Sequence, residues 1–323
     1  MNRRRLARYI AQRLLLLLPL AFLVSLFVFL LASIVPGGPV AAIIGSHPLN
    51  EVTIEQLRHK YHLDQPIYQQ YWGWLTQVVI HHNLGRSILT QTPVSSSIGA
   101  RIWLTLTLNL GGIAFALFFG IPLGVLSAVK RGRPLDRGAV AFTIFFGNAP
   151  AFVISLVGLY VFGLKLGWVP LFGDGTAAIG DRLHHLILPI LVLGIAGMAL
   201  IMRITRAAMI DQLDQDYIVF ARARGLTSRR VIAFYAFRNA LIPVLTAAGL
   251  LLIGVLTGAP FVETVFGLPG LGSLLVSSVQ NVDIPVIQGL VLIVAAWIII
   301  ANILIDIAYA VIDPRVGFEK AAA

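Results

Sequence analysis

Six long apolar runs, free of Asp, Glu, Lys and Arg, constrain this chain more than any other feature of its sequence. They lie at roughly residues 14–36, 102–129, 138–164, 183–202, 239–262 and 284–305. A helix needs about 20 residues to cross the ~30 Å hydrocarbon core of a bilayer, so each run is long enough to span it. Only 12% of the residues are charged, against about 25% in soluble domains. We therefore predict an all-α polytopic membrane protein with about six transmembrane helices.

The basic residues predict how these helices are oriented. Eighteen of the 24 Lys and Arg residues lie on the side that holds both termini, and six lie on the other side. Because cytoplasmic loops carry the excess of positive charge, we expect both termini in the cytoplasm. The same rule accounts for the net charge of +10, so no nucleic-acid partner is expected.

This topology divides the chain into four parts. They are a tail and first span at 1–36, an extracytoplasmic segment at 37–101, a transmembrane core at 102–311 with a cytoplasmic loop at 203–238, and a cytoplasmic tail at 312–323.

The extracytoplasmic segment is predicted to contain two short helices. The second begins near Asp64 as its cap, has Pro66 in its first turn, and places Tyr71, Trp72 and Trp74 at the membrane interface. A docking platform for a partner and a packed interfacial helix pair are both compatible with this pattern.

Prolines and glycines interrupt other parts of the core. Pro150 and Pro189 fall within apolar runs and are predicted to kink or break them, with Asn148 as a polar group beside the first kink. A later outer segment near 258–285 is semi-apolar and rich in Gly and Pro. Irregular backbone at membrane depth is tolerated where it lines a water-filled space, so we expect this segment near the mouth of a pathway.

Several kinds of chemistry are missing from the sequence. None of the four lysines is followed by Ser or Thr, so there is no P-loop for ATP. Neither a nucleophile elbow nor a zinc-protease helix is present, and the chain has no cysteine. His59 and His62 have a spacing that permits metal binding, but solvated histidines are the expectation, so we predict no metal site and no catalytic residue.

The apolar runs themselves argue against a proton- or ion-coupled carrier. Such proteins usually bury ionisable groups near the middle of the membrane, and the runs contain none. Asp306 comes closest, with Asn302 and Tyr309 on the same face, and a hydrogen-bonded structural role is expected for it. An ion-coupled transporter, a channel and a membrane enzyme remain the alternatives to the function inferred below.

A basic segment, DYIVFARARGLTSRR at 216–230, separates the fourth and fifth runs. Tyr217, Phe220, Ala221 and Arg224 recur with the spacing of one helical face. A helix is therefore predicted here, on the cytoplasmic side.

Two further signals predict that this helix ends and that a second helix begins after it. Gly225 can adopt the left-handed conformation that terminates a helix, and Thr227 or Ser228 can cap a second helix that leads into the fifth span. The predicted unit is a helix, a sharp turn and a helix joined directly to two spans. Its arginines suit either lipid phosphates or an acidic protein partner.

The same segment carries a family resemblance. ARARGL at 221–226, preceded by DYIVF and followed by RNALIPVL, resembles the cytoplasmic EAA loop of ABC importer permeases of the dipeptide, oligopeptide and nickel branch. GIPLGVLSAVKRGRPLDR, VETVFGLPGLGSLL and the DPR at 313–315 are similar to that branch as well. The resemblance covers nearly the whole chain, and the long outer segment looks like that of the first, B-type permease of the branch's pair.

The resemblance implies a type I importer permease fold, a multi-pass location in the bacterial plasma (inner) membrane, and a role in the import of short peptides by alternating access. The implied partners are a second homologous permease, two cytoplasmic ATPase subunits and an extracytoplasmic substrate-binding protein. ATP and Mg would be held by the ATPase subunits, so no cofactor is expected in this chain.

The resemblance also assigns residues to two sites. The expected ATPase-coupling residues are Asp216, Tyr217, Phe220, Ala221, Arg222, Ala223, Arg224, Gly225 and Leu226; Phe220 stands where the loop nominally has an acidic residue. The residues expected to contact the pathway or the binding protein are Asn148, Pro150, Glu263, Phe266 and Pro269.

Overall fold

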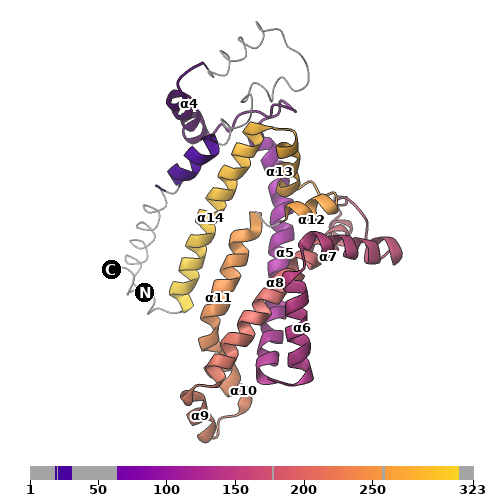
Figure 1. Cartoon of the computed structure of the whole chain (residues 1–323), viewed down its shortest axis with the longest axis vertical. Helices are drawn as coiled ribbons and strands as arrows, with labels where there is room; N and C mark the ends of the chain where they lie inside the picture. Colours follow the sequence, from indigo (N-terminus) through magenta and orange to yellow (C-terminus); the bar gives the residue numbers. More distant parts are fainter. Residues whose placement is uncertain (1–18, 20, 31–63, 177, 257–258, 313–323) are drawn as a thin grey trace. The chain divides into compact units, whose positions relative to one another are not determined.

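The computed structural model describes residues 19, 21–30, 64–176, 178–256 and 259–312. Regular structure in these ranges is helical, apart from one isolated antiparallel bridge between Arg86 and Pro93 (Figure 1). The chain divides into two compact units, one of residues 1–103 and 270–300 and the other of residues 104–269 and 301–323. We call them the first and second units.

Among the residues that the structure describes, the helices that belong to the first unit alone are Ala21–Leu30, α4 (Ile67–Val79) and α13 (Leu271–Gln280). The second unit holds α6 (Pro134–Asn148), α7 (Ala151–Gly158), the π-helical η1 (Leu159–Lys165), α8 (Ile179–Leu213), α9 (Asp216–Ala223), α10 (Ser228–Arg230), the π-helical η2 (Val231–Ala236), α11 (Phe237–Ile253), the 3-10 turn η3 (Gly254–Leu256) and α12 (Pro260–Val265). Two long helices, α5 (Val94–Val129) and α14 (Ile284–Ile312), have residues in both units.

Within the described residues, four helices are long and apolar enough to cross a membrane. They are Val94–Val129, Ile179–Leu213, Ser228–Ile253 and Ile284–Tyr309, and they correspond to the second, fourth, fifth and sixth apolar runs. The fifth run was predicted to continue to residue 262, but the helix ends at Ile253. Most of the first run lies outside the described residues, although Ala21–Leu30 within it is helical.

The third apolar run is not one straight helix. α6 and the α7–η1 helix meet at an angle of 102°, so together they form a broken span or a re-entrant loop. Ala149 is extended (φ −71°, ψ 129°), as expected for a residue that precedes proline. Pro150 is therefore a true break. Pro189, in contrast, lies inside α8, which runs from Ile179 to Leu213, so of the predicted kink or break the break does not occur.

α8 is the central helix of the second unit, where it packs against α6, α7, α11 and α12. Glycines of α5 allow close contact on another of its faces. A Cβ added at Gly124 would lie 2.7 Å from Cβ of Thr205, and one added at Gly120 would lie 3.1 Å from Ile201. Such small residues let membrane helices approach closely, and the side chains of Thr205 and Ile201 on α8 occupy the space that a Cβ at these two glycines would take.

In the first unit, α4 packs against the helix Ala21–Leu30. Tyr71 is buried, its ring lies edge-on to Phe22 and Phe29, and its hydroxyl is 2.9 Å from Oγ of Ser25. The helix begins at Ile67 with Pro66 in the capping position and no side-chain cap, so the predicted cap at Asp64 was wrong. The predicted preceding helix and its histidines lie outside the described residues.

Candidate coupling hairpin, buried ion pair and cavity

The basic segment folds as a helical hairpin between α8 and α11. α9 ends at Ala223, and Gly225 follows with φ +76°. The N–H of Gly225 donates to the carbonyl of Arg222 (2.9 Å), and the N–H of Leu226 donates to that of Ala221 (3.3 Å). This pair of bonds is a Schellman motif, which reverses the chain after a helix. The predicted role of Gly225 in ending the helix is thereby confirmed.

The second arm of the hairpin leads into a span, also as predicted. Thr227 occupies the capping position of α10, and α10, η2 and α11 follow one another without a gap. No side-chain cap bond forms at Thr227, so the predicted hydroxyl cap is absent. Figure 1 shows the hairpin at one end of the second unit, with α8 and α11 rising from its two arms.

The inner face of the hairpin is a small apolar core. Ile218 and Ala221 of α9 are buried together with Met209 of α8 and Val231 and Ala236 of η2. Burial of this face attaches α9 to both spans.

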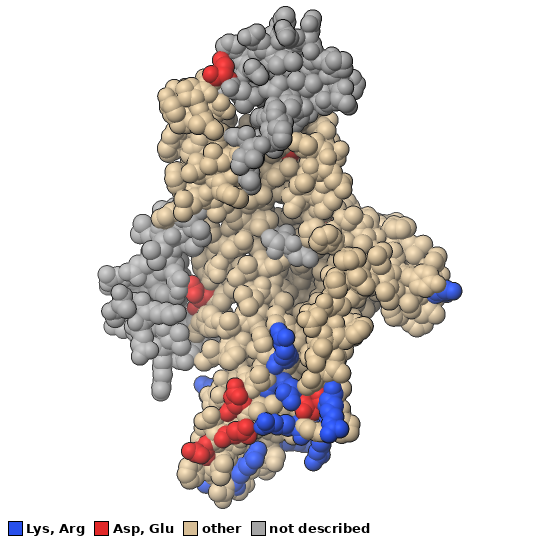
Figure 2. Space-filling view, in the orientation of Figure 1, with Lys and Arg blue, Asp and Glu red and all other residues tan. Residues whose placement is uncertain are grey.

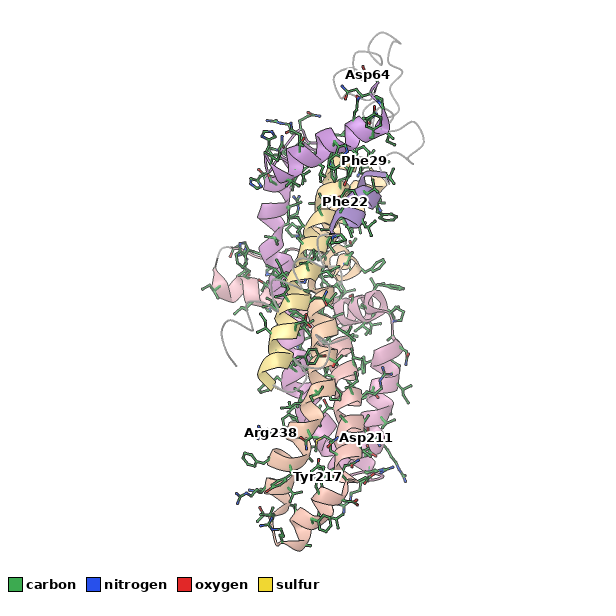
Figure 3. All side chains as sticks on the ribbon, turned by 90° about the vertical axis from the view of Figure 1, so that its left-hand side faces the viewer. Phe22, Phe29, Asp64, Asp211, Tyr217 and Arg238 are labelled. Atoms are coloured by element: carbon green, nitrogen blue, oxygen red, sulfur yellow. The ribbon has the colours of Figure 1, made fainter. Side chains whose placement is uncertain are left out.

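Polar contacts add to this attachment. The Tyr217 hydroxyl donates to Oε1 of Gln212 at 2.7 Å and accepts from Nδ2 of Asn239 at 3.0 Å, joining α9 to α8 and α11. Figure 3 labels Tyr217 at this end of the unit, near Asp211 and Arg238.

The residues predicted to share one face of α9 differ in their burial. Ala221 points into the core and is 5% exposed, whereas Phe220 is 68% exposed. Val219 is exposed as well, and so are Asp216, Arg222, Ala223 and Arg224. The exposed surface of α9 is therefore made by Val219, Phe220 and the charged residues around them, while Ala221 packs in the core of the hairpin.

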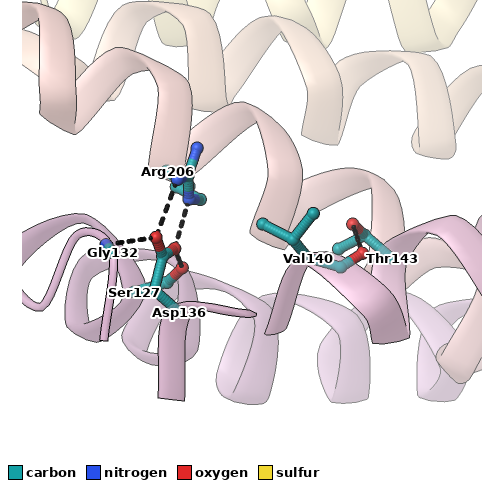
Figure 4. Close-up of polar contacts among 6 residues, drawn as sticks. All are labelled: Ser127, Gly132, Asp136, Val140, Thr143 and Arg206. Atoms are coloured by element: carbon teal, nitrogen blue, oxygen red, sulfur yellow. Dashed lines mark hydrogen bonds and ion pairs between the residues drawn. The ribbon is translucent and has the colours of Figure 1, made fainter. Parts of the chain in front are cut away.

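A buried ion pair lies near the hairpin, and the sequence analysis missed it. Nε of Arg206 on α8 donates to Oδ1 of Asp136 on α6 at 2.6 Å, and its NH2 nitrogen donates to Oδ2 at 2.9 Å. Ser127 Oγ (2.5 Å) and the N–H of Gly132 (2.8 Å) donate to the same carboxylate (Figure 4). Asp136 is only 3% exposed. The pair, which we call the inner clamp, joins α5, the α5–α6 turn, α6 and α8.

The charge around this end of the second unit is strongly positive. Figure 2 shows Lys and Arg side chains gathered over the end that carries α9, α10 and the α5–α6 turn. The clustering agrees with the predicted cytoplasmic side.

A cavity of about 400 Å³ opens in the second unit between α5, α6, α8 and the end of α11. Its walls are mainly small or aliphatic, and three of the lining side chains, Asn109, Thr143 and Arg203, are polar. The full lining is Asn109, Gly112, Ile113, Thr143, Gly147, Ala151, Leu193, Ala196, Gly197, Ala199, Leu200, Arg203, Leu250, Leu251 and Gly254. The break between α6 and α7 lies at its edge, since Gly147 and Ala151 flank it on either side.

Comparison with known proteins identifies the architecture. Residues 120–318 match the family described as the inner membrane component of binding-protein-dependent transport systems, and residues 6–109 match the N-terminal region of such membrane components. The chain belongs to this family. It is therefore a multi-pass protein of the bacterial inner membrane and a permease of the ABC importer class.

Relatives and solved structures agree with this assignment. The chain is 41% identical to a protein of Brucella suis biovar 1 provisionally named a peptide permease, over 96% of this chain and 98% of that protein. It is 38% identical to the glutathione transport system permease protein GsiC of Escherichia coli K12, over 96% and 99%. An inward-facing structure of the MetNI methionine ABC transporter matches with a TM-score of 0.56 and 19% identity, over 67% of this chain and 96% of that one. The last similarity shows the type I permease fold.

The five residues predicted for the pathway or the binding protein differ in their burial. Glu263 is fully buried, and its Oε1 accepts a hydrogen bond from the Thr105 hydroxyl at 2.6 Å. Phe266 is buried in an apolar cluster, whereas Asn148, Pro150 and Pro269 are exposed. These are residues expected at the pathway, yet none lines the cavity described above.

A further buried carboxylate, which like Asp136 was missed in the sequence, lies in the first unit. Asp283 is 3% exposed and immediately precedes α14. Its Oδ2 accepts from Ser87 Oγ (2.5 Å), and its Oδ1 accepts from the N–H of Ile88 (3.1 Å). We call this group the outer knot. Acidic residues just before an apolar run, or in its first turn, were the available signal for both Asp136 and Asp283, but the sequence does not name their partners.

The described residues contain no group of three metal-binding side chains. His184 and His185 instead contact backbone carbonyls of Trp168 and Asp181, at 2.7 and 2.9 Å.

Elsewhere in the second unit, the Tyr309 hydroxyl is 2.6 Å from Thr246 Oγ1, which joins α14 to α11.

Proposed function

We propose that this chain is the permease subunit of an ABC importer for short peptides. It forms the translocation pathway with a second, homologous permease and receives solute from an extracytoplasmic substrate-binding protein. Two cytoplasmic ATPase subunits hydrolyse the ATP, with Mg, so the chain itself catalyses no reaction. Relatives named as peptide and glutathione permeases support this substrate class.

The observation that carries the proposal is the hairpin of α9 and α10. It is fastened to two spans by the buried residues Ile218 and Ala221, and it presents Val219 and Phe220 outward. An exposed aromatic residue surrounded by arginines suits an apolar cleft with an acidic rim on a partner. The hairpin is the coupling element in this account, and the ATPase subunit is the partner.

The inner clamp extends the coupling beyond the hairpin. α8 carries both Met209, in the hairpin core, and Arg206, in the clamp. A displacement of α9 therefore moves α8, and α6 moves with it because Asp136 is held by two hydrogen bonds from Arg206. α6 ends at the break beside the cavity, so the movement reaches the wall of the pathway. Such rigid-body shifts of packed helices are a common mechanism of alternating access.

The outer residues take different roles in this proposal. Pro269, which is exposed, and the exposed residues among 64–101 are the candidates for contact with the binding protein. Buried Glu263 and Phe266 position α12 from inside, through Thr105 and the apolar cluster. Thiols placed at Glu263 or Phe266 are thus not expected to reach a soluble partner.

Purification tests the assembly. A tagged chain extracted from its native membrane should co-purify with a second permease and an ATPase subunit. Reconstituted with the binding protein, this complex should take up peptide only when ATP is supplied. Uptake by the chain alone under an ion gradient, without ATP, would overturn the proposal in favour of an ion-coupled carrier.

Gly225 allows a sharper test of the coupling element. Gly225→Ala forces a side chain into φ +76°, although no atom lies within 4 Å of the new Cβ. Gly167→Ala is a matched control, because Gly167 has φ +64° and equally open surroundings but lies outside the hairpin. Both changes introduce similar strain of about 1 kcal/mol, yet only Gly225→Ala should lower peptide uptake per ATP hydrolysed. Equal effects of the two variants would count against the hairpin.

A further inference from the structure

The cavity in the second unit contains one cation, Arg203. It lies three residues before Arg206 on α8, and the two arginines have different surroundings. Arg206 is neutralised by Asp136 in the inner clamp. Arg203 is exposed, lines the cavity, and makes no hydrogen bond or ion pair with any described residue. Its guanidinium thus brings five donors and an uncompensated charge to a cavity that no Asp or Glu lines.

The other polar side chains of the cavity have acceptor capacity. Nδ2 of Asn109 donates to the carbonyl of Thr105 at 2.9 Å, which leaves Oδ1 to accept. The Thr143 hydroxyl donates to the carbonyl of Val140 at 2.8 Å, so its oxygen can accept as well (Figure 4). The cavity therefore combines one fixed positive charge with neutral acceptors on an otherwise apolar wall.

This combination selects a class of ligand. A guanidinium pairs with a carboxylate through two parallel hydrogen bonds, and the pair is strengthened where apolar walls lower the local dielectric. Neutral acceptors suit the N–H groups of an amide. The volume of about 400 Å³ falls at the lower end of the range for small-molecule sites, about 300–1,000 Å³.

We infer that Arg203 binds the free carboxylate of the transported solute inside this cavity, with Asn109 and Thr143 accepting from its amide or amino groups. The inference rests on the proposed function for the nature of the solute, a short peptide. Positive charge at the cytoplasmic end of a span also follows from membrane topology alone, and the experiment separates that reading from the binding role.

The absence of cysteine from the chain makes a direct test possible. Ala196 lines the cavity seven residues before Arg203, about 10 Å along the helix and on nearly the same face. Ala196→Cys is placed in the reconstituted complete transporter, and its reaction rates with an anionic and a cationic methanethiosulfonate are compared. With Arg203 present, the anionic reagent should be favoured by about threefold or more over its ratio in an Arg203→Gln background. Arg137→Gln, which removes an exposed cation that does not line the cavity, should leave the ratio unchanged.

Protection by ligand then tests the carboxylate. Dialanine should slow the labelling of the thiol in the Ala196→Cys variant, whereas dialanine amide should protect at least threefold less, and Arg203→Gln should remove the difference. Equal protection by acid and amide, no protection by either, or an unchanged reagent ratio in Arg203→Gln would each overturn the inference. The last result is the one expected if Arg203 only contacts lipid phosphate. ATP-dependent uptake by the same vesicles reports separately on the proposed function.

Discussion

The inner clamp and the outer knot each hold a buried aspartate, but with different hydrogen-bond donors. Each centres on an aspartate that is 3% exposed and lies at the start of a helix, where negative charge is favoured. Asp136 is held by a cation and two neutral donors, whereas Asp283 is held by neutral donors, a hydroxyl and an N–H. In the clamp, the carboxylate of Asp136 neutralises the positive charge of Arg206 on α8. Among the described residues, the knot contains no cation that would lose its counter-charge if Asp283 were substituted.

That difference separates a mechanical role from a structural one. The clamp joins α6 to the helix that continues into the hairpin, so its loss should affect both stability and coupling. The knot joins the loop at Ser87 to the start of α14, within the first unit, and should affect stability alone. Substitutions at the two sites can break or sharpen this distinction.

The largest effect is expected from Asp136→Asn. It leaves the half-buried Arg206 without its counter-charge, and breaking such a pair costs about 3 kcal/mol in the free energy of unfolding. Uptake per ATP hydrolysed should also fall, because α6 is released from α8. Thermal unfolding of the purified complex and the transport-to-ATPase ratio measure the two effects.

The partner substitution serves as the control for this result. Asp136→Asn combined with Arg206→Gln removes both charges, so the double variant should be less destabilised than the sum of the single variants. Strict additivity, or an unchanged transport ratio in Asp136→Asn, would mean that the clamp does not work as a charge pair that couples two helices.

Asp283→Asn should have a smaller effect. The amide oxygen can still accept one hydrogen bond, and no cation of the knot is stranded, so the expected loss is about 1–2 kcal/mol. The transport-to-ATPase ratio should stay at the wild-type value. If that ratio fell as far as in Asp136→Asn, the distinction between clamp and knot would be lost.

The smallest effects concern the two serines. Ser127→Ala removes one of several donors to Asp136, so we expect a loss of about 1 kcal/mol or less. Ser87→Ala should cost more, because Ser87 Oγ both donates to Asp283 and accepts from the N–H of Thr90 at 3.0 Å. Unfolding temperatures of the two variants, measured side by side, give the order; the reverse order would argue against this account of the two sites.

The parts of the fold that could be predicted from the sequence depend on local signals. Four apolar runs became long helices because length and composition alone decide such helices. The end of α9 just before Gly225 was also predictable, since a glycine that can adopt positive φ is enough to form the turn that ends a helix.

The parts that could not be predicted depend on contacts between distant residues. Spacing grouped Phe220 with Ala221, but packing against α8 and η2 decides which of them is buried. Asp136 and Arg206 are 70 residues apart, and no periodicity pairs them. The assignment of particular residues to contacts with the ATPase and the binding protein stays a prediction.

Cross-linking from position 220 tests the central claim most directly. In the cysteine-free chain, Phe220→Cys bears a thiol-linked photoreactive benzophenone within the complex in its native membrane, and the adducts are identified by mass spectrometry. Val79→Cys is the control, because Val79 is 60% exposed, close to the 68% of Phe220, but lies on α4. The account predicts an adduct with the ATPase subunit from position 220 and none from position 79. An ATPase adduct from neither position, or from both, would contradict the assignment of the hairpin as the coupling element.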